Sequence, residues 1–422
     1  LVSALPVSAV ITDVASVKHS VVEAARQILG ESALRFVPGH PIAGSEQSGF
    51  QAASDDLFRN RKVILTPVDD TAPEAIREVN ALWRSLGAQV LGMTVSRHDE
   101  VLAATSHLPH LLSYALVEVL VRNQQSEDIF RYAAGGFADF SRLASSDPIM
   151  WADIFSANAK ATTAILDAYI ARLQELRGAV IRADHEQLRE SFRLAKSTRD
   201  RVMNKLTNPN LAEPPANGSL DLIAGPGGKM SGSLRVPGDK SISHRAVIFG
   251  ALAEGVTRID GFLEGEDSLN TLAAFREMGV TATGPDAGRL VIYGVGMRGL
   301  QAPGKPLDMG NSGTAMRLLA GLLSAPKFAS ELTGDESLSR RPMKRIIDPL
   351  RRMGARIDST PAGTPPLRIK GTGLQAIDYE LPVASAQVKS AILLAAMYAE
   401  GKTRVRQTVV CRDHTERMLA GF

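Results

Sequence analysis

Cysteine is nearly absent from the sequence, since Cys411 is the only one in 422 residues. A single cysteine excludes a disulfide framework and a Cys-rich zinc site, and it fits the reducing environment of the cytoplasm. An excess of charge of one sign is also lacking, because 48 Lys and Arg residues stand against 45 Asp and Glu residues. This balance excludes a general nucleic-acid or membrane-surface binder.

Long apolar runs are missing too. No stretch approaches the ~18–20 apolar residues that cross a bilayer, and the chain does not begin with the basic and then apolar segments of a signal peptide. With 44% hydrophobic and 22% charged residues, the composition is that of an ordinary globular protein. At about 150 residues per domain, the length predicts two to three domains. We therefore expect a cytoplasmic multidomain protein.

Both ends of the sequence resemble cuts. It begins at Leu1 rather than Met, close to strand-like sequence, and it ends at Phe422 directly after a helical pattern. We therefore expect a fragment of a longer protein.

The texture of the sequence changes along the chain. From residue 1 to 94, short β-rich runs alternate with amphipathic helix patterns, which predicts an α/β domain with a parallel sheet. From 95 to 206 the pattern is nearly continuous helix with charged outer faces, and such helices often pack across a dimer. Residues 207–218 hold three prolines and three asparagines and predict a linker.

Residues 219–422 contain a repeat. Three Ala- and Leu-rich helix patterns begin with small polar residues, at Ser241, Ser312 and Ser385, and a second helix follows an acidic turn in each unit. Strand-like runs separate the helices. The pattern predicts an α/β domain built from a βαβαββ-like unit that is present about three times.

Two motifs in the first segment combine strand ends with polar residues. The run VITDVASVK places Thr12, Asp13 and Ser16 between an apolar strand and a helix, where Ser16 suits an N-cap without excluding a functional role. The run FVPGHPIAGSE places His40 in a Gly-His-Pro loop, with Glu46 downstream. A loop histidine is more often incidental than catalytic, but ligands bind at this end of the strands in open α/β sheets.

The helical segment carries two further motifs. The run SHLPH contains His107 and His110; a metal pair is one interpretation, but no Cys or carboxylate cluster accompanies them, and we expect no metal. The run GGFADFSR contains Asp139 and Arg142. Arg142 is either a solvated surface charge or the guanidinium that binds a substrate carboxylate.

Together and in this order, the motifs of residues 1 to about 206 resemble the prephenate dehydrogenase family, which includes cyclohexadienyl and arogenate dehydrogenases. The resemblance implies a partial dinucleotide-binding (Rossmann-like) domain, a helical dimerisation domain, and NAD(P)-dependent oxidative decarboxylation of prephenate or arogenate toward tyrosine. It implies that His40, oriented by Ser16, takes the proton of the ring hydroxyl as hydride leaves, a role that suits a neutral imidazole. The remaining implied contacts are Glu46, His110, Asp139 and Arg142 with substrate, and Thr12 and Asp13 with the cofactor.

Two departures from the family pattern leave its specificity open. Ala138 stands where members often carry Lys or Arg, which leaves the choice between prephenate and arogenate open. The dinucleotide fingerprint G-x-G-x-x-G, with its first strand and helix, is absent from this part of the chain, which leaves the choice between NAD and NADP open. We expect the chain to be inactive on its own.

The helix starts of the repeat concentrate cations and amides. Free N–H groups and the helix dipole favour anions at such starts. The residues concerned are Lys240, Ser241 and Arg245 in the first unit, Asn311, Gly313 and Arg341 in the second, and Ser385 and Gln387 in the third. A capped repeat with solvated charges explains the capping but not the placement of Lys and Arg, so we expect a highly anionic small ligand.

These segments resemble the N-terminal half of EPSP synthase (3-phosphoshikimate 1-carboxyvinyltransferase) over about residues 219–422. The resemblance implies enolpyruvyl transfer from phosphoenolpyruvate to shikimate 3-phosphate, without metal or cofactor. It implies that Lys240 and Arg341 bind the phosphate of phosphoenolpyruvate near Gly313. The implied contacts with shikimate 3-phosphate are Ser241, Arg245, Ser385 and Gln387, and Asn311 belongs to the same site. Cys411 stands where members often have Ser, and the usual second domain with its proton-transfer carboxylate is not in this chain.

The sequence therefore predicts a fragment of a bifunctional enzyme of aromatic amino acid biosynthesis. Its expected partners are small-molecule substrates and a second copy of itself, and not nucleic acid or a membrane. The alternative is a non-catalytic, dimerising, anion-binding scaffold derived from the same two enzymes. A scaffold, however, has no need of His40, Ser16, Lys240, Arg245 and Arg341.

Overall fold

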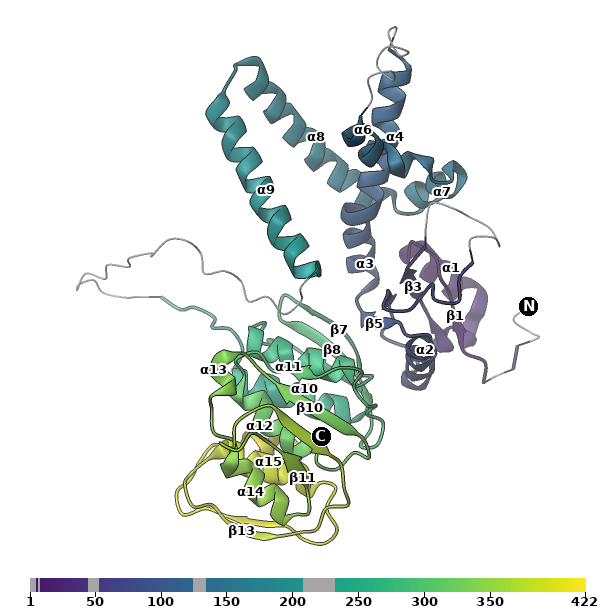
Figure 1. Cartoon of the computed structure of the whole chain (residues 1–422). Coiled ribbons are helices and arrows are strands. Elements are labelled where there is room, and N and C mark those ends of the chain that lie inside the picture. The colour runs from purple at the N-terminus through teal and green to yellow at the C-terminus, as the bar shows by residue number, and fades with distance from the viewer. Residues whose placement is uncertain (1–4, 7, 45–52, 124–133, 208–231) are drawn as a thin grey trace.

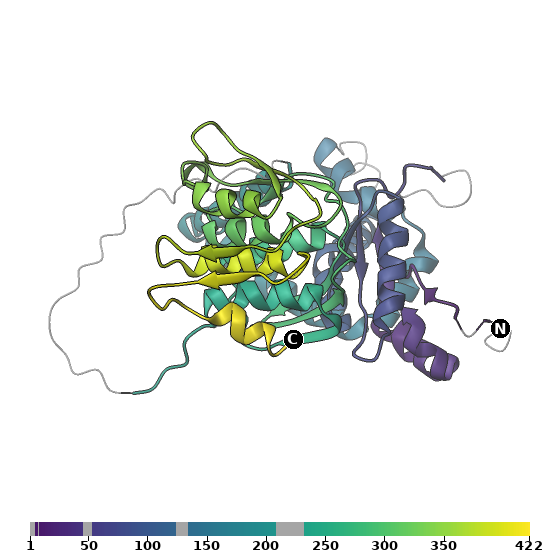
Figure 2. The same cartoon turned by 90° about the horizontal axis from the view of Figure 1, so that it is seen from below.

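The computed structural model describes residues 5–6, 8–44, 53–123, 134–207 and 232–422. Figure 1 shows an N-terminal region, with a small sheet below a tier of long helices, and a C-terminal region in which helices pack among short sheets. Figure 2, seen from below, shows the two regions next to each other. None of the described helices is both long and apolar enough to span a membrane.

The N-terminal sheet confirms the predicted α/β character of the first segment. Its elements are β1 (Ile11–Thr12), α1 (His19–Leu29), β2 (Phe36–Val37), β3 (Gly39–Ile42), β4 (Lys62–Leu65), α2 (Pro73–Ser85) and β5 (Gln89–Gly92). Strand β1 pairs in parallel with β2, and β4 pairs in parallel with β5.

Strand β3 departs from the sequence prediction, because it runs antiparallel to β4. The expectation of a parallel sheet is therefore wrong here, and His40 lies on β3 rather than in a loop. Parallel strands need a long crossover, usually a helix. The described part of the connection to β4, residues 53–61, contains turns and no helix.

The next segment is almost entirely helical where it is described, as predicted. It comprises α3 (Val95–Leu102), a π-helical turn (Ala103–His107), α4 (Leu108–Val121), α6 (Gly135–Ser141), α7 (Pro148–Ala157), α8 (Ala159–Ile181) and α9 (His185–Thr207). Helices α8 and α9 form an antiparallel hairpin (Figure 1). Large apolar side chains on both helices remain exposed, namely Ile170, Leu173, Val180, Ile181, Phe192, Leu194, Val202 and Met203.

The C-terminal region contains the predicted alternation of helices and short strands. Its helices are α10 (Lys240–Leu252), α11 (Glu266–Glu277), α12 (Gly313–Leu322), α13 (Glu336–Ser339), α14 (Lys344–Arg352), α15 (Ala386–Ala396) and α16 (His414–Leu419). Its strands are β6 (Glu254–Ile259), β7 (Thr281–Asp286), β8 (Arg289–Val295), β9 (Leu307–Asp308), β10 (Ala329–Thr333), β11 (Arg356–Asp358), β12 (Leu367–Lys370), β13 (Asp378–Glu380) and β14 (Arg404–Arg406). The strands β11-β12-β10-β9 form one sheet, β13-β14 form a second, and β7-β8-β6 belong to a third.

Three inner helices, α10, α12 and α15, form the centre of the C-terminal core. The hydroxyl groups of Ser312 and Ser385 cap α12 and α15, as the repeat predicts. In the first unit the cap is Asp239, whose carboxylate accepts from the backbone N–H of Ile242, so Ser241 lies inside α10. A carboxylate and a hydroxyl are both effective N-caps, and sequence spacing alone does not separate them.

The α12–α15 contact depends on a glycine. A Cβ atom placed on Gly321 would lie 2.2 Å from the backbone oxygen of Ala391, well inside van der Waals contact. The two helix backbones are therefore closer than any side chain at Gly321 permits.

We expect Gly321→Ala to destabilise the C-terminal region by about 1–3 kcal/mol, because overpacking forces α15 away from α12. Chemical denaturation of the variant measures this change. The matched control is Gly178→Ala in α8, where the added Cβ meets only the flexible end of Arg182. That control should gain stability by up to ~1 kcal/mol through helix propensity, and a shift of the same sign in both variants would contradict the packing argument.

Candidate active sites

A chain of buried side chains links β3 to α3. Nδ1 of His40 lies 2.8 Å from Nε2 of His98, and Nδ1 of His98 lies 2.8 Å from Oδ1 of Asp99. His40 is 8% exposed and His98 is fully buried. Helix α3 begins just beyond the end of β5, and this position carries His98 over the sheet to His40.

Burial decides the ionisation of this chain. Burial and the neighbouring charge of His98 lower the pKa of His40 to about 3, so its ring is neutral near pH 7. Burial by itself would raise the pKa of Asp99. Hydrogen bonds from His98 and from two backbone N–H groups outweigh that effect and lower the pKa of Asp99, which is therefore ionised.

The ionised carboxylate sets the direction of the hydrogen bonds. It only accepts, so Nδ1–H of His98 donates to Asp99. With Nδ1–H of His98 on Asp99, the tautomer that completes the chain has Nε2 of His98 accept from Nδ1–H of His40. This arrangement leaves Nε2 of His40 unprotonated and able to take a proton.

Asp99 also caps helix α1. Its Oδ1 accepts from the backbone N–H of Lys18 and its Oδ2 from that of His19, each at 2.9 Å. The N-cap position is Lys18, so the prediction of Ser16 as N-cap is wrong. Among the described residues the Ser16 side chain has no hydrogen bond, and the orientation of His40 by Ser16 stays a prediction.

Thr12 and Asp13, predicted for the cofactor, use their side chains within the chain. Thr12 donates to the carbonyl of Val37 at 2.7 Å. Asp13 accepts from the backbone N–H of Gly39 at 3.1 Å and pairs with Nζ of Lys18, which is fully buried. The Thr12 side chain thus holds β1 against β2, and the Asp13 side chain holds the start of β3.

The two histidines of SHLPH lie near Trp151. The His110 ring stacks on Trp151 at 3.7 Å between ring centroids, and its Nδ1 lies 2.8 Å from the carbonyl of Ser106. His107 is buried, and its Nδ1 lies 3.2 Å from Nδ2 of Asn158. Burial lowers the pKa of both rings, that of His107 to about 4. Within the described ranges no three His, Cys, Asp or Glu residues are grouped as a metal site.

Three further residues are predicted to contact the dehydrogenase substrate. Asp139 is exposed on α6, and Arg142 is exposed at the following turn of 3₁₀ helix. Glu46 lies outside the described residues. The substrate contacts assigned to these three residues stay predictions.

A second candidate site lies where the three inner helices of the C-terminal region begin. A cavity of about 280 Å³ is lined by Lys240 and Ser241 of α10, Thr314 of α12, Gln387 of α15 and also by Arg245, Ala386, Arg412 and His414. Lys240 forms an ion pair with Asp267 at 2.9 Å, and Arg412 donates to Oγ of Ser241 at 3.2 Å. The repeat thus brings its three helix starts to one cavity, as a site for a small anion requires.

Arg245 is the buried anchor of this cavity. Its guanidinium donates to Oγ1 of Thr415 and Oγ of Ser390, both at 2.7 Å, and to the carbonyl of Ser241 at 2.8 Å. Burial lowers its pKa. Arg245 therefore joins α10, α15 and α16, and its predicted contact with a shikimate carboxylate is untested.

The second unit holds Arg341 against Asn311. Arg341 donates to Oδ1 of Asn311 at 2.5 Å, and Nδ2 of Asn311 donates to Asp335 at 2.7 Å. A Cβ on Gly313 would lie 2.8 Å from Nη1 of Arg317 and 3.3 Å from Nη1 of Arg341. The missing side chain of Gly313 thus lets two guanidinium groups approach the helix start.

The third unit connects to the second through Gln387. Its Oε1 accepts from Arg317 at 2.8 Å, and its Nε2 donates to Oγ1 of Thr314 at 2.9 Å. A neighbouring cavity of about 450 Å³ is lined by Ser385, Gln387, Arg412, Cys411, Ala386 and Val410. The thiol of Cys411 donates to Oε1 of Gln407 at 3.0 Å.

Sequence reasoning missed His98, Asp99 and Arg412. The pair His98-Asp99 follows a strand end, where polar residues are frequent at ligand sites. Arg412 is adjacent to Cys411, which was noted only as a departure from a family pattern. Residue type and spacing alone do not single out these three positions, and the fold is needed to find them.

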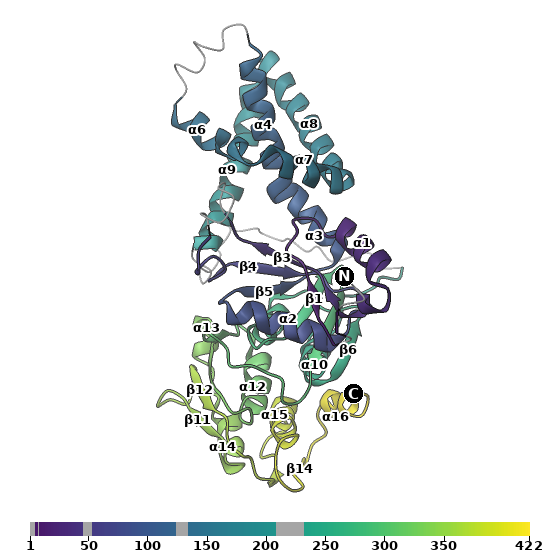
Figure 3. The same cartoon turned by 90° about the vertical axis from the view of Figure 1, so that its right-hand side faces the viewer.

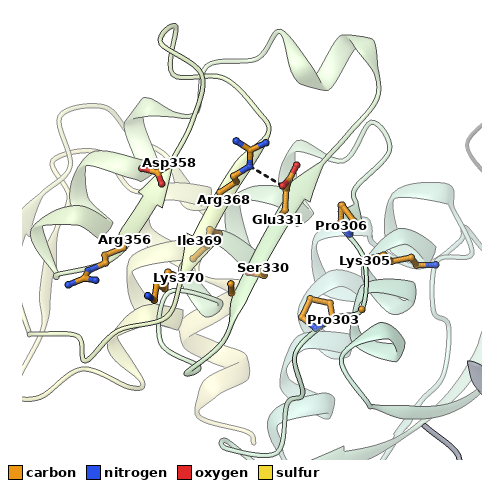
Figure 4. A pocket seen from close by; sticks show the side chains of 12 residues that line it. Pro303, Lys305, Pro306, Ser330, Glu331, Arg356, Asp358, Arg368, Ile369 and Lys370 are labelled. Carbon is orange, nitrogen blue, oxygen red and sulfur yellow. Dashed lines mark hydrogen bonds and ion pairs between the residues drawn. The ribbon is translucent and has the colours of Figure 1, made fainter. Parts of the chain in front are cut away.

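A further groove lies outside both sites, on the outer face of β10, β11 and β12 (Figure 4). Its volume is about 440 Å³, and Arg368 in it pairs with Glu331 at 3.0 Å. None of the residues predicted to bind substrate lines this groove.

The letters of a dinucleotide fingerprint do occur in the C-terminal region, as GVGMRG at residues 294–299. They begin with the last two residues of β8 and lead into a turn and not into a helix. An added Cβ at Gly294 would meet the oxygen of Ala253 at 2.2 Å, and at Gly299 that of Val295 at 2.0 Å. These glycines serve close backbone packing and provide no helix N-terminus for a pyrophosphate.

The geometry defines two candidate sites in succession, one with a buried hydrogen-bonded chain from His40 to Asp99 and one with a cavity where three helix starts meet. Residues 1–92 match the nucleotide-binding domain of prephenate dehydrogenase, and residues 94–194 match its dimerization domain. Residues 225–422 match EPSP synthase (3-phosphoshikimate 1-carboxyvinyltransferase). The chain is therefore similar to prephenate dehydrogenase in its first part and to EPSP synthase in its second, and each of these models covers less than half of the chain.

Curated relatives match the second part. The 3-phosphoshikimate 1-carboxyvinyltransferase of Methylococcus capsulatus is 66% identical over 200 residues, which are 47% of this chain and 46% of that protein. The same enzyme of Alkalilimnicola ehrlichii is 65% identical over 198 residues, 47% of this chain and 44% of that protein. The chain thus spans less than half the length of these two relatives.

Solved structures match each part. EPSP synthase from Acinetobacter baumannii is 61% identical, and the match covers 45% of this chain and 43% of that protein, with a TM-score of 0.45. Prephenate dehydrogenase from Aquifex aeolicus, in complex with hydroxyphenyl propionate and NAD+, is 39% identical and covers 48% of this chain and 70% of its own, with a TM-score of 0.45. Synechocystis arogenate dehydrogenase is 29% identical, and the match covers 48% of this chain and 72% of that protein, with a TM-score of 0.43.

The depressed pKa of His40 predicts an acid-sensitive N-terminal region. The folded state keeps the ring neutral down to about pH 3, whereas the unfolded chain binds a proton below about 6.5. Stability from this residue is therefore complete above pH 6.5 and is lost as the pH falls toward 3. Between pH 7 and 5, the unfolding free energy of the parent should therefore fall more steeply than that of His40→Asn. We expect the two slopes to differ by up to about 1.4 kcal/mol per pH unit.

Urea denaturation at several pH values measures this slope. The exposed His185→Asn on α9 is the control and should keep the parent slope. An unchanged slope in His40→Asn would show that protonation of His40 is not linked to unfolding.

Proposed function

We propose that the first part of the chain supplies the substrate side of a dehydrogenase that oxidatively decarboxylates prephenate or arogenate toward tyrosine. The observation that carries this proposal is the hydrogen-bonded chain from His40 through His98 to Asp99. The family matches over residues 1–194 support it. No observation favours the alternative of a non-catalytic scaffold.

In this proposal Nε2 of His40 takes the proton of the ring hydroxyl of the substrate. The C–H bond at the same carbon breaks as hydride leaves, and a carbonyl forms. The C–C bond to the ring carboxylate then breaks to release CO2, its electron pair makes the ring aromatic, and the former carbonyl oxygen takes a proton to become a phenol hydroxyl. Asp99 stabilises the imidazolium charge through His98, as a carboxylate does for a hydrogen-bonded histidine. His110, Asp139, Arg142 and Glu46 are the proposed contacts with the polar groups of the substrate.

The hydride acceptor in this proposal is NAD or NADP, and a nicotinamide supplies two-electron oxidation when bound. Within described residues 8–44 and 53–92, α1 and α2 do not begin at a glycine-rich turn of the kind that holds the pyrophosphate of such a cofactor. The side chains of Thr12 and Asp13 are engaged within the chain, and GVGMRG leads into no helix. We propose that the cofactor contacts the backbone at Thr12 and Asp13.

His40→Asn tests the dehydrogenase proposal in the protein expressed from the full reading frame that contains this sequence. We expect kcat with prephenate to fall by about 10²–10⁴, with little change in KM, because a general base acts in the transition state. His98→Asn should lower kcat in the same direction through the orientation of His40. The double variant should be no slower than His40→Asn alone, since the two residues act as a unit.

The control is His185→Asn, which should keep parent kinetics. An unchanged kcat in His40→Asn would remove this residue from the mechanism. Independent losses in the double variant would remove His98 as a positioning residue.

We further propose that the protein is a cytoplasmic homodimer through its helical region. The support is the match of residues 94–194 to a dimerization domain and the exposed apolar side chains of α8 and α9. Groups of exposed apolar side chains are typical of interaction sites.

For the second part we propose enolpyruvyl transfer from phosphoenolpyruvate to shikimate 3-phosphate, without metal or cofactor. The observation that carries this proposal is the cavity at the three helix starts, which Lys240, Arg245 and Arg412 line. Cations and helix N-termini together bind phosphate and carboxylate groups. Arg341, with Gly313 and Asn311, is the proposed contact with the phosphate of phosphoenolpyruvate, and Ser241, Ser385 and Gln387 are proposed contacts with shikimate 3-phosphate.

Lys240→Met tests this second proposal in the same full-length protein. We expect synthase turnover to fall at least ~100-fold, as for loss of one charge-stabilising group, while thermal stability is unchanged because Lys240 is half exposed. The control is the exposed Lys402→Met, which should keep full turnover. Full activity in Lys240→Met would contradict the assignment.

A further inference from the structure

The sheets of the two regions meet at their edges. Gly92 at the end of β5 pairs in parallel with Thr283 of β7, which gives one six-stranded sheet in the order β3-β4-β5-β7-β8-β6. An edge strand exposes unpaired backbone groups, and pairing with another edge removes that exposure from both. Figure 3 shows α2 and β5 lying against the C-terminal region.

The residue at the junction has to be small. A Cβ atom on Gly92 would lie 2.6 Å from the backbone oxygen of Ala282 and 3.4 Å from Cγ2 of Thr281. The three nearest atoms all belong to the C-terminal region. The demand for glycine at this position therefore comes from the contact between the two regions.

Helix α2 provides polar contacts along the same face. Nδ2 of Asn80 donates to Oγ1 of Thr281 at 2.7 Å, and these residues are 4% and 5% exposed. Arg84 donates to the carbonyls of Arg276 and Glu277, at 3.2 and 2.7 Å, at the C-terminal end of α11. Cations are favoured there by the unpaired carbonyls and the helix dipole.

The apolar core continues across the junction. Tyr293 of β8 is 3% exposed and packs in one cluster with Val79, Trp83 and Val90 of the N-terminal region. Val256 and Val291 pack against the same cluster. If the regions were apart, Asn80 would lose its hydrogen bond to Thr281, and the apolar cluster that contains Tyr293 and Trp83 would be exposed to solvent.

We propose that the two enzyme regions of this chain dock on each other as one fixed unit, through β5 and α2 on one side and β7, β8 and the end of α11 on the other. The partner of each surface is the other part of the same chain. This docking does not depend on either proposed activity. It rests on backbone pairing, a buried side-chain hydrogen bond, helix-end contacts and a shared core.

Chemical cross-linking tests the docking in the 422-residue chain. Asp69 and Arg258 form an exposed ion pair across the junction at 3.5 Å, so both positions accept cysteine without disturbing a core. The parent for the test is Asp69→Cys/Arg258→Cys in a Cys411→Ser background, treated with a short bis-maleimide. The control pair is Asp69→Cys/Lys402→Cys, with a second cysteine at another exposed position.

We expect the Asp69–Arg258 pair to link within one chain at least about tenfold faster than the control pair, because docking holds the two thiols at high effective concentration. Gly92→Val should reduce that rate about tenfold, with circular dichroism and thermal unfolding showing that both regions remain folded. Gly304→Ala, where an added Cβ meets open space, should leave the rate unchanged.

Three outcomes would overturn the proposal. Linking no faster than the control pair would show that the regions do not dock. Linking only between two chains, seen as a product of twice the mass, would show that the surfaces join different molecules. An unchanged rate in folded Gly92→Val would show that the β5–β7 contact does not hold the regions together.

Discussion

A buried charge must be paired and hydrogen-bonded, and this constraint shapes both candidate sites. Lys18 and Asp99 are buried in the first region, and each is held by contacts that also fix the position of α1 or of His98. Arg245 and Lys389 are buried in the second region, where they join α10 and α15 to α16 through Ser390, Thr415 and Glu416. The polar networks that stabilise the fold are therefore the networks that orient the candidate catalytic and binding groups.

Close backbone approach is the second requirement that both regions share. Gly321 allows α12 to lie against α15, and Gly92 allows β5 to lie against β7. In each case a single Cβ atom would collide with a carbonyl oxygen of the partner element. Glycine here acts through the space that it leaves rather than through a left-handed backbone.

The sequence predicted much of the fold, because strand and helix periodicity and Gly and Pro punctuation are local signals. Strands β4 and β5 of the first segment and the helices of the repeat lie where these signals place them. Local signals failed at β3, whose direction depends on the connection to β4, and at the caps of α1 and α10. The cap of α1 comes from Asp99, about eighty residues away in sequence, and no local pattern contains it.

What the sequence by itself determined is the resemblance to two families, because short motifs such as GGFADF and GDKSISHR are specific in their residue types and order. Only the tertiary structure decided that His98 and Asp99 stand behind His40, and that three helix starts meet at one cavity. It also decided that two sheet edges join at Gly92. The physical reason is that hydrogen bonds and steric contacts act over a few ångströms in space, and residues distant in sequence reach that range only when the chain has folded.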